Sequence, residues 1–194
     1  MIEEKTYRSM MHQYGCVGSW AIWEDVAVKP KSNVGNMRIF ERDDLLKILN
    51  TQHVFVGLNI SRILIDKVWG NFHDFRSAST DYKIRYALRD TPLWGSYMTD
   101  IFKDLQEKDS KKVPDFLKKN KLYEEQNVNF FLEEISHLGI QKPILVAFGK
   151  MVHEILNKYF DKKFEIKLIP HYASYMSKEK YRCEVDRILI NPNT

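Results

Sequence analysis

Cysteine is scarce in this sequence: only Cys16 and Cys183 occur among 194 residues. Two cysteines are too few for a four-cysteine zinc or iron-sulfur site, so we expect ordinary reduced thiols. The five histidines before residue 170 also lack the spacing of metal ligands. We therefore expect neither a metal nor a cofactor.

Long apolar runs are absent too, and the N-terminal stretch MIEEKTYRSMM is too charged for a secretory signal. These absences predict a soluble, cytoplasmic protein without a membrane partner. The sequence has no GxxxxGK, GxGxxG or GxSxG motif, which argues against nucleoside-triphosphate binding, dinucleotide binding and serine-hydrolase chemistry. The formal net charge of +4 is mildly basic, and it permits a nucleic-acid partner without requiring one.

What the sequence does contain is a series of short apolar runs that alternate with helical patterns. Hydrophobic residues make up 44% of the chain, enough for one sizeable core, so we predict a single domain. Strands are predicted within residues 53–61, 95–103, 142–149 and 164–171, and helices over about 41–49, 80–89, 124–138, 149–160 and 178–189. This alternation predicts an α/β fold with a mainly parallel sheet covered on both faces. Residues 1–40 are predicted to be an N-terminal extension packed on the domain.

The stretch at residues 53–61, HVFVGLNIS, organises the rest of the chain. Its β-branched and aromatic run stops at Gly57, which predicts a buried strand that delivers Asn59 to a loop. In α/β sheets, ligands bind at the loops that follow the carboxyl ends of strands. Two later strands also end in polar residues, at Asp100 and at His171, so these three side chains are candidates for one site.

An aromatic-rich segment, residues 62–76, follows the first strand and contains Trp69, Phe72 and Phe75. Its composition indicates a long packed loop, and long ordered loops in compact domains are often functional. Taken singly, however, each of these rings is more often part of a core than of a binding site. The lysine-rich stretch at residues 108–121 also contains acidic residues, and it indicates a solvated face.

Five segments, taken in order, resemble the motifs of the uracil-DNA glycosylase superfamily. They are Gly57-Leu58-Asn59, the aromatic-rich loop with Phe72, Tyr97-Met98-Thr99-Asp100, residues 144–150 (ILVAFGK), and Pro170-His171 with the serine-containing loop after it. The resemblance spans about residues 50–190. It implies a three-layer α/β/α sandwich with a four-stranded mainly parallel sheet, in a monomer that flips a damaged base out of DNA and hydrolyses its N-glycosidic bond.

The resemblance also implies a role for each matching residue. Asn59 would hold the attacking water, because an amide can position water but cannot act as a base, and His171 would stabilise the negative charge that develops on the departing base. Phe72 would stack on the extruded base, with Phe75 and Trp69 as rivals. The residues that would contact the base are Phe72, Asp100, Gly57 and Leu58.

The loop at residues 171–177, HYASYMS, matches the segment that the family presses into the DNA minor groove. Serine hydroxyls and backbone amides would meet phosphates there, and an apolar side chain would fill the vacated stack. The candidates for this wedge are Tyr172, Tyr175 and Met176, and Lys180 and Arg182 could add phosphate contacts. The predicted DNA-binding residues are Tyr172, Ser174, Tyr175, Ser177 and Lys178.

Three positions depart from the family pattern. Ile60 stands where Pro often follows the first motif, and Tyr172-Ala173 stand where Pro and Ser often follow the histidine. The third departure is Asp100, where the family usually has an Asn that donates to O4 of uracil and accepts from N3–H. An ionised carboxylate only accepts, so we predict slow or absent uracil excision relative to some other damaged base.

Two other functions fit the same residues. A catalytically silent relative would bind nucleic acid or another protein through the same cleft, and an α/β enzyme acting on a free nucleoside-like molecule would share only the fold. Structural roles also fit: Asn59 as a turn residue, His171 as a helix cap or a partner of a backbone carbonyl, and Asp100 paired with Lys103.

Overall fold

The computed structural model describes residues 2–60, 67–76, 78–107 and 109–191. Its helices are α1 (Glu4–Tyr14), α2 (Leu45–Ile48), α3 (Tyr82–Leu88), α4 (Val113–Lys119), α5 (Lys121–His137), α6 (Lys150–Phe160) and α7 (Lys178–Leu189). Its strands are β1 (Ser19–Trp20), β2 (Asn50–Asn59), β3 (Ser96–Phe102), β4 (Ile144–Phe148) and β5 (Ile166–Ile169), and short 3-10 helices lie at Met37–Glu41 and Ser110–Lys112. No helix in the described ranges is long and apolar enough to cross a membrane.

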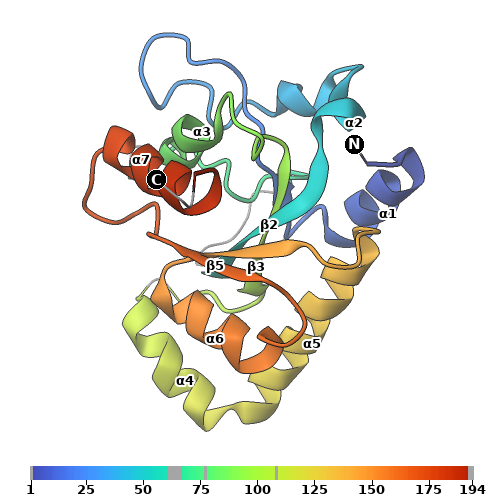
Figure 1. Ribbon diagram of the computed structural model, residues 1–194, viewed down its shortest axis with the longest axis vertical. Coiled ribbons are helices and arrows are strands. Elements are labelled where there is room, and N and C mark those ends of the chain that lie inside the picture. The colour runs from blue at the N-terminus through green and yellow to red at the C-terminus, as the bar shows by residue number, and fades with distance from the viewer. Residues whose placement is uncertain (1, 61–66, 77, 108, 192–194) are drawn as a thin grey trace.

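The strands form one sheet in the order β1-β3-β2-β4-β5 (Figure 1). Strands β3, β2, β4 and β5 run parallel, so their carboxyl ends lie along one edge of the sheet. The predicted count of four strands is too low, because β1 pairs antiparallel with β3, Ser19 opposite Met98 and Trp20 opposite Tyr97. A strand of two residues has no periodicity to detect in a sequence.

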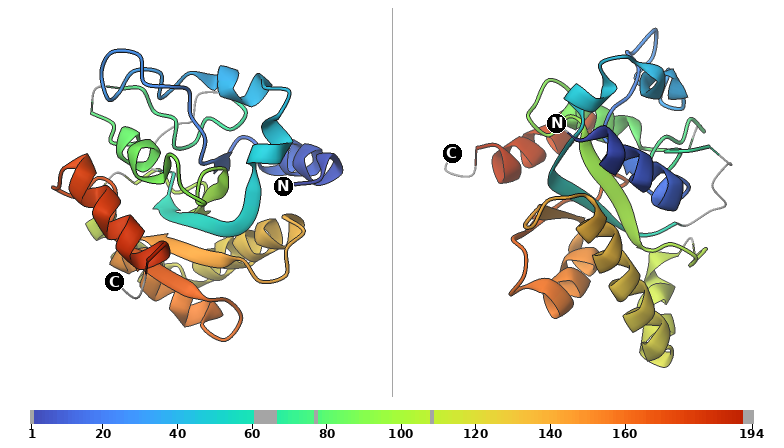
Figure 2. Two further views of the ribbon diagram at one scale, coloured as in Figure 1. Left: turned by 45° about the horizontal axis from the view of Figure 1, so that its top comes forward. Right: turned by 90° about the vertical axis from the view of Figure 1, so that its right-hand side faces the viewer.

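Side chains that alternate along the strands divide the interior into two cores, one on each face of the sheet. Val54 and Val56 of β2 belong to the core beside α5 and α6. Phe55 of β2 and Phe148 of β4 belong to the core beside α3 and α7, where their rings stack with centroids 5.6 Å apart. Figures 1 and 2 show α3 and α7 on one side of the sheet and α4, α5 and α6 on the other. The elements therefore form three layers.

Most predicted elements are observed, with shifts at their ends. The last helix has the predicted bounds, whereas the helix predicted over residues 124–138 begins earlier, at Lys121. The apolar run of β2 was predicted to stop at Gly57, but the strand continues to Asn59. Residues 113–119 form α4, a helix that their composition does not indicate. Ser61 and the start of the aromatic-rich loop lie outside the described residues.

The N-terminal segment is joined to the sheet by aromatic packing. The fully buried ring of Trp20 lies 5.9 Å from that of Trp69, centroid to centroid. Ser19 Oγ donates a hydrogen bond of 2.7 Å to the carbonyl oxygen of Trp69, and Trp23 Nε1 donates one of 3.4 Å to the carbonyl oxygen of Phe72. These contacts account for both N-terminal tryptophans and anchor residues 69–72.

A buried polar network lies on the α5 side of β3. Glu134 Oε1 accepts hydrogen bonds from Tyr97 OH (2.7 Å) and Thr99 Oγ1 (2.9 Å), and Lys103 Nζ lies 2.7 Å from Glu134 Oε2. Lys103 Nζ also donates to Thr99 Oγ1 at 2.8 Å and to the carbonyl oxygen of Asp100 at 2.5 Å. A buried carboxylate is tolerated only when it is paired and hydrogen-bonded, so this network fixes the carboxyl end of β3.

Candidate functional site

The candidate site is centred on Gly57, in the middle of the sheet. Gly57 lies opposite Asp100 in the register of β2 and β3. A Cβ atom on Gly57 would lie 2.1 Å from Asp100 Oδ1 and 3.4 Å from Cζ of Phe72. Carbon and oxygen cannot approach to 2.1 Å without a bond, so only glycine allows the carboxyl group to occupy this position. The Asp100 carboxyl group and the edge of the Phe72 ring therefore both lie over the Gly57 backbone.

Asp100 is held by Asn71, a residue that the sequence analysis did not single out. Asn71 Nδ2 donates to Asp100 Oδ2 and to the carbonyl oxygen of Val17, both at 2.8 Å, while Asn71 Oδ1 accepts from the backbone N–H of Phe72 at 3.1 Å. The alternative pairing of Asp100 with Lys103 is not observed between side chains, because Lys103 pairs with Glu134 and meets only the Asp100 carbonyl.

The Asp100 carboxyl group has an unusual proton affinity. Its burial raises its pKa to about 6, from an ordinary value of 3.8. The hydrogen bond from Asn71 and the charge of Lys103 lower the pKa, but the loss of hydration outweighs them. The group is therefore about half protonated near pH 6, and a protonated carboxyl both donates and accepts.

The aromatic-rich loop directs one of its three rings into the site. Trp69 is buried against Trp20, and Phe75 is exposed, so neither rival faces Asp100. Phe72 is buried, with its ring centroid 6.0 Å from that of Phe148. The φ angles of Trp69 and Phe72 are 63° and 60°, a left-handed conformation that costs a bulky residue roughly 1 to 2 kcal/mol. The hydrogen bonds of Asn71, Ser19 and Trp23 to this loop hold the two strained residues in place.

His171 and Tyr172 follow the end of β5, and their rings lie near Phe148. Their rings stack with centroids 4.5 Å apart, and both lie near Phe148, at 6.4 Å and 5.1 Å. The backbone N–H of Ala173 donates to His171 Nδ1 at 3.0 Å. Nδ1 is then an acceptor, so the neutral ring carries its proton on Nε2. Although His171 has an exposed side, loss of hydration among these groups lowers its pKa, which favours this neutral form.

Asn59 is less closely joined to the others. It is the last residue of β2 and faces the same side as Gly57, about 7 Å further along the strand. Its Nδ2 group donates to the carbonyl oxygens of Leu105 (2.7 Å) and Glu107 (2.8 Å), which fixes the amide and leaves Oδ1 as its acceptor. Leu58, predicted to contact the base, instead packs toward the core on the opposite face.

The predicted DNA-binding loop is braced at its centre and open at its tip. Lys83 Nζ donates to the carbonyl oxygen of Ser174 at 3.0 Å, and Ser177 Oγ accepts from the backbone N–H of Lys180 as the N-cap of α7. Ser174 Oγ is buried, so its hydroxyl does not face outward. Tyr175 is fully exposed, whereas Tyr172 packs against the core beside α3 and α7.

The structure thus brings Gly57, Phe72, Asp100 and His171 into one chain of contacts, with Asn59 at the rim. Within the described ranges, no three His, Cys, Asp or Glu side chains are grouped to hold a metal ion. The chain matches no protein-family model, no curated protein and no solved structure. Fold and site together define an α/β sandwich protein with an aromatic-walled site at the carboxyl edge of its sheet.

The raised pKa of Asp100 predicts a pH-dependent stability. Between about pH 4 and pH 7 the folded protein binds more protons at Asp100 than the unfolded chain, so the free energy of unfolding falls as pH rises through this window. Asp100→Asn removes this titration with little change in shape. We expect the variant to gain about 2 to 3 kcal/mol over the wild type between pH 4 and pH 7.5, measured by urea denaturation.

Asp115→Asn, which removes an exposed carboxylate from α4, controls for the change in net charge. If the stability difference between Asp100→Asn and the wild type does not vary with pH, the carboxyl group does not retain a proton in the folded state.

Proposed function

We propose that this protein is a DNA glycosylase that extrudes a damaged base and hydrolyses its N-glycosidic bond. The observation that carries the proposal is that Asp100 and Phe72 both lie over Gly57, while the rings of Phe72 and His171 both lie near Phe148. An extruded base needs a flat apolar partner, a polar group that reads its edge and a donor for its developing negative charge. Phe72, Asp100 and His171 are chemically suited to these three tasks.

Asn59 is suited to holding the attacking water. Its two amide hydrogens are occupied by the carbonyls of Leu105 and Glu107, so Oδ1 is the atom of the amide that can accept a hydrogen bond from water. A water that donates to Oδ1 keeps a lone pair for attack on C1′ of the sugar. An amide cannot remove a proton, so its contribution is orientation, and the positive charge that builds on the sugar makes even a neutral water an adequate nucleophile.

His171 is suited to stabilising the leaving base. The hydrogen bond from Ala173 to Nδ1 directs the Nε2–H donor away from the loop backbone. A neutral imidazole donor stabilises the oxygen that gains negative charge as the glycosidic bond breaks, and it does so without prior protonation. The His171 side chain is exposed enough to reach a base that enters from outside.

Tyr172 must move before a base can enter. Its ring lies edge-on against Phe72, with an interplanar angle of 67°, and against Phe148, at 78°. It therefore covers the rings on which a base would stack. In the uracil-DNA glycosylase superfamily, which this chain resembles, Pro and Ser often follow the corresponding histidine and have no such ring. The covering of Phe72 and Phe148 by Tyr172 is therefore particular to this chain.

Excision itself is tested on duplex oligonucleotides that each carry one damaged base, with abasic sites detected by alkaline cleavage. We expect abasic product from at least one lesion, and a loss of about 100-fold in rate for both Asn59→Ala and His171→Ala. Asn129→Ala and His12→Ala, on exposed helical faces, are matched controls and should retain activity. Salt-sensitive DNA binding without abasic product from any lesion would instead identify a catalytically silent protein.

Uracil excision should depend on the proton of Asp100. Ionised Asp100 only accepts hydrogen bonds and opposes O4 of uracil, whereas the protonated carboxyl can donate to O4 and accept from N3–H. With a pKa of about 6, uracil excision by the wild type should rise about tenfold from pH 7.5 to pH 6. Asp100→Asn should excise uracil faster than the wild type at pH 7.5 and lose this pH dependence. Uracil as the best substrate of the wild type at pH 7.5 would contradict the assignment.

Tyr175 is the best candidate for the wedge that fills the vacated stack. Tyr172 and Met176 pack against the core, whereas Tyr175 is fully exposed on a loop that Lys83 braces. Tyr175→Ala should slow excision from duplex DNA by about tenfold, because one aromatic contact with a base contributes about 1 to 3 kcal/mol. The loss should be smaller on single-stranded DNA, which has no stack to fill, and Tyr175→Phe should restore activity. An equal loss on both substrates would rule out a wedge.

A further inference from the structure

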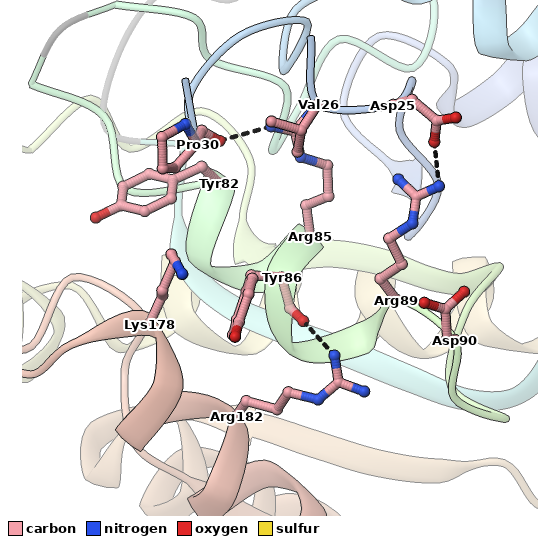
Figure 3. Close-up of a pocket in the computed structure, with 10 residues that line it drawn as sticks. All are labelled: Asp25, Val26, Pro30, Tyr82, Arg85, Tyr86, Arg89, Asp90, Lys178 and Arg182. Carbon is pink, nitrogen blue, oxygen red and sulfur yellow. Dashed lines mark hydrogen bonds and ion pairs between the residues drawn. The ribbon is translucent and has the colours of Figure 1, made fainter. Parts of the chain in front are cut away.

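A cavity lies between α3, the beginning of α7 and the loop at residues 25–30, away from Gly57 (Figure 3). Its volume is about 510 Å³. Its lining combines cationic side chains and tyrosine rings, namely Arg85, Arg89, Lys178, Arg182, Tyr82 and Tyr86. Asp25 and Asp90 also line it, so cations outnumber carboxylates among its lining residues.

Arg85 is the buried cation of this cavity. Its guanidinium group donates to the backbone carbonyl oxygens of Glu24 (2.9 Å) and Pro30 (2.6 Å), and only 1% of the residue is exposed. These neutral carbonyls hold the side chain in place but do not neutralise its charge. Burial lowers the pKa of Arg85, and the nearby charge of Arg89 lowers it further. An added anion would therefore be stabilised here.

Two further cations come from α7 and are positioned by Tyr86. Lys178 Nζ lies 3.9 Å from the centroid of the Tyr86 ring, and Arg182 donates from Nη1 to the Tyr86 carbonyl oxygen at 3.2 Å. Their carboxylate partners, Glu179 and Asp186, lie on the same helix, and Asp186 approaches Arg182 only to 3.7 Å. Partly exposed pairs of this kind contribute about 0 to 1 kcal/mol, so a phosphate can replace them.

Arg89 closes the cavity on the side of the loop. It forms an ion pair with Asp25, which a dashed line marks in Figure 3, and the Asp25 side chain is 80% exposed. The apolar wall comes from Val26, Pro30 and the tyrosine rings. A cavity with cations at its edge and flat apolar walls suits a ligand that joins a phosphate to a flat ring.

We propose that this cavity binds a nucleotide, with the phosphate against Lys178 and Arg182 and the remainder against the apolar wall. Guanidinium groups bind phosphate oxygens through paired hydrogen bonds, and ammonium groups bind them as point charges. The volume falls within the range of small-molecule sites, roughly 300 to 1,000 Å³, and exceeds what inorganic phosphate requires. The inference does not rest on base excision, because no residue around Gly57 takes part.

The nucleotide has two possible sources, a free molecule or one unit of a DNA strand. Lys178 directly follows the loop at residues 171–177, so a strand bound at that loop can continue to this cavity. Both sources present the same chemistry to Lys178 and Arg182. Competition between them distinguishes one from the other.

The test is calorimetric titration of the full chain with dTMP, thymidine and inorganic phosphate, without any damaged DNA. We expect dTMP to bind with a Kd below about 1 mM, and the two fragments to bind at least about tenfold more weakly. Arg182→Met should weaken dTMP binding by about tenfold or more, the effect of one charge-assisted hydrogen bond. Arg187→Met, the same substitution at an exposed position of the same helix outside the cavity lining, should leave the Kd unchanged.

A 5′-phosphorylated, undamaged single-stranded oligonucleotide that displaces dTMP would identify the strand as the source, and dTMP binding without displacement would identify a free nucleotide. Absence of dTMP binding would overturn the proposal. So would phosphate binding as tight as dTMP binding, or equal effects of Arg182→Met and Arg187→Met. Because no lesion is present, these results are independent of whether the protein excises bases.

Discussion

The contact between the Gly57 backbone and the Asp100 carboxyl group determines the geometry of the whole candidate site. It exists because β2 and β3 are parallel neighbours in which Gly57 and Asp100 stand side by side, and because glycine offers no Cβ at that point. Asn71 then fixes the carboxyl group and the backbone of Phe72 at once. Sheet, loop and N-terminal segment are therefore locked together by one amide side chain.

Strand β3 separates two buried acids that are accommodated in opposite ways. On the α5 side, Glu134 is compensated by Lys103 and by the hydroxyls of Tyr97 and Thr99. On the other side, Asp100 receives a neutral amide donor, so burial acts on it with less opposition. Glu134 is stabilised by its ion pair with Lys103, whereas Asp100 has a raised pKa and binds a proton more readily. Asp100 is therefore a group whose hydrogen-bonding character changes with pH.

The sequence predicted the parts of the fold that depend on local pattern. Short apolar runs mark the parallel strands. The helical spacing of Val128, Phe131 and Ile135 marks α5, and all three residues are buried. Strand β2 continues through Gly57 to Asn59, because a glycine within a strand also marks a place where a neighbouring group approaches the backbone closely, here the Asp100 carboxyl group. Strand β1 has only two residues, so it shows no periodic pattern in the sequence. Its pairing with β3 and the aromatic contacts of Trp20 hold it in place.

The sequence identified most candidate residues of the site, but it did not predict which of them contact one another. Asn59, Asp100 and His171 could be selected because they are polar residues at strand ends. Nothing in the sequence separates Phe72 from Trp69 and Phe75, since all three are aromatic and only tertiary packing decides which ring faces inward. Asn71 was missed because its partners, Val17 and Asp100, lie 54 and 29 residues away. Its position beside a strained aromatic residue is visible only in the structure.

The anchoring of residues 69–72 on Ser19, Val17 and Trp20 also bears on how the chain acquires its shape. These early residues leave the ribosome long before β3 exists, and β1 has no pairing partner until Ser96 to Met98 have been synthesised. Contacts between distant parts of a chain slow folding, because loops must close before the contacts form. We therefore expect β1 and the anchor of residues 69–72 to form after the local helices, once residues 97 and 98 have been synthesised.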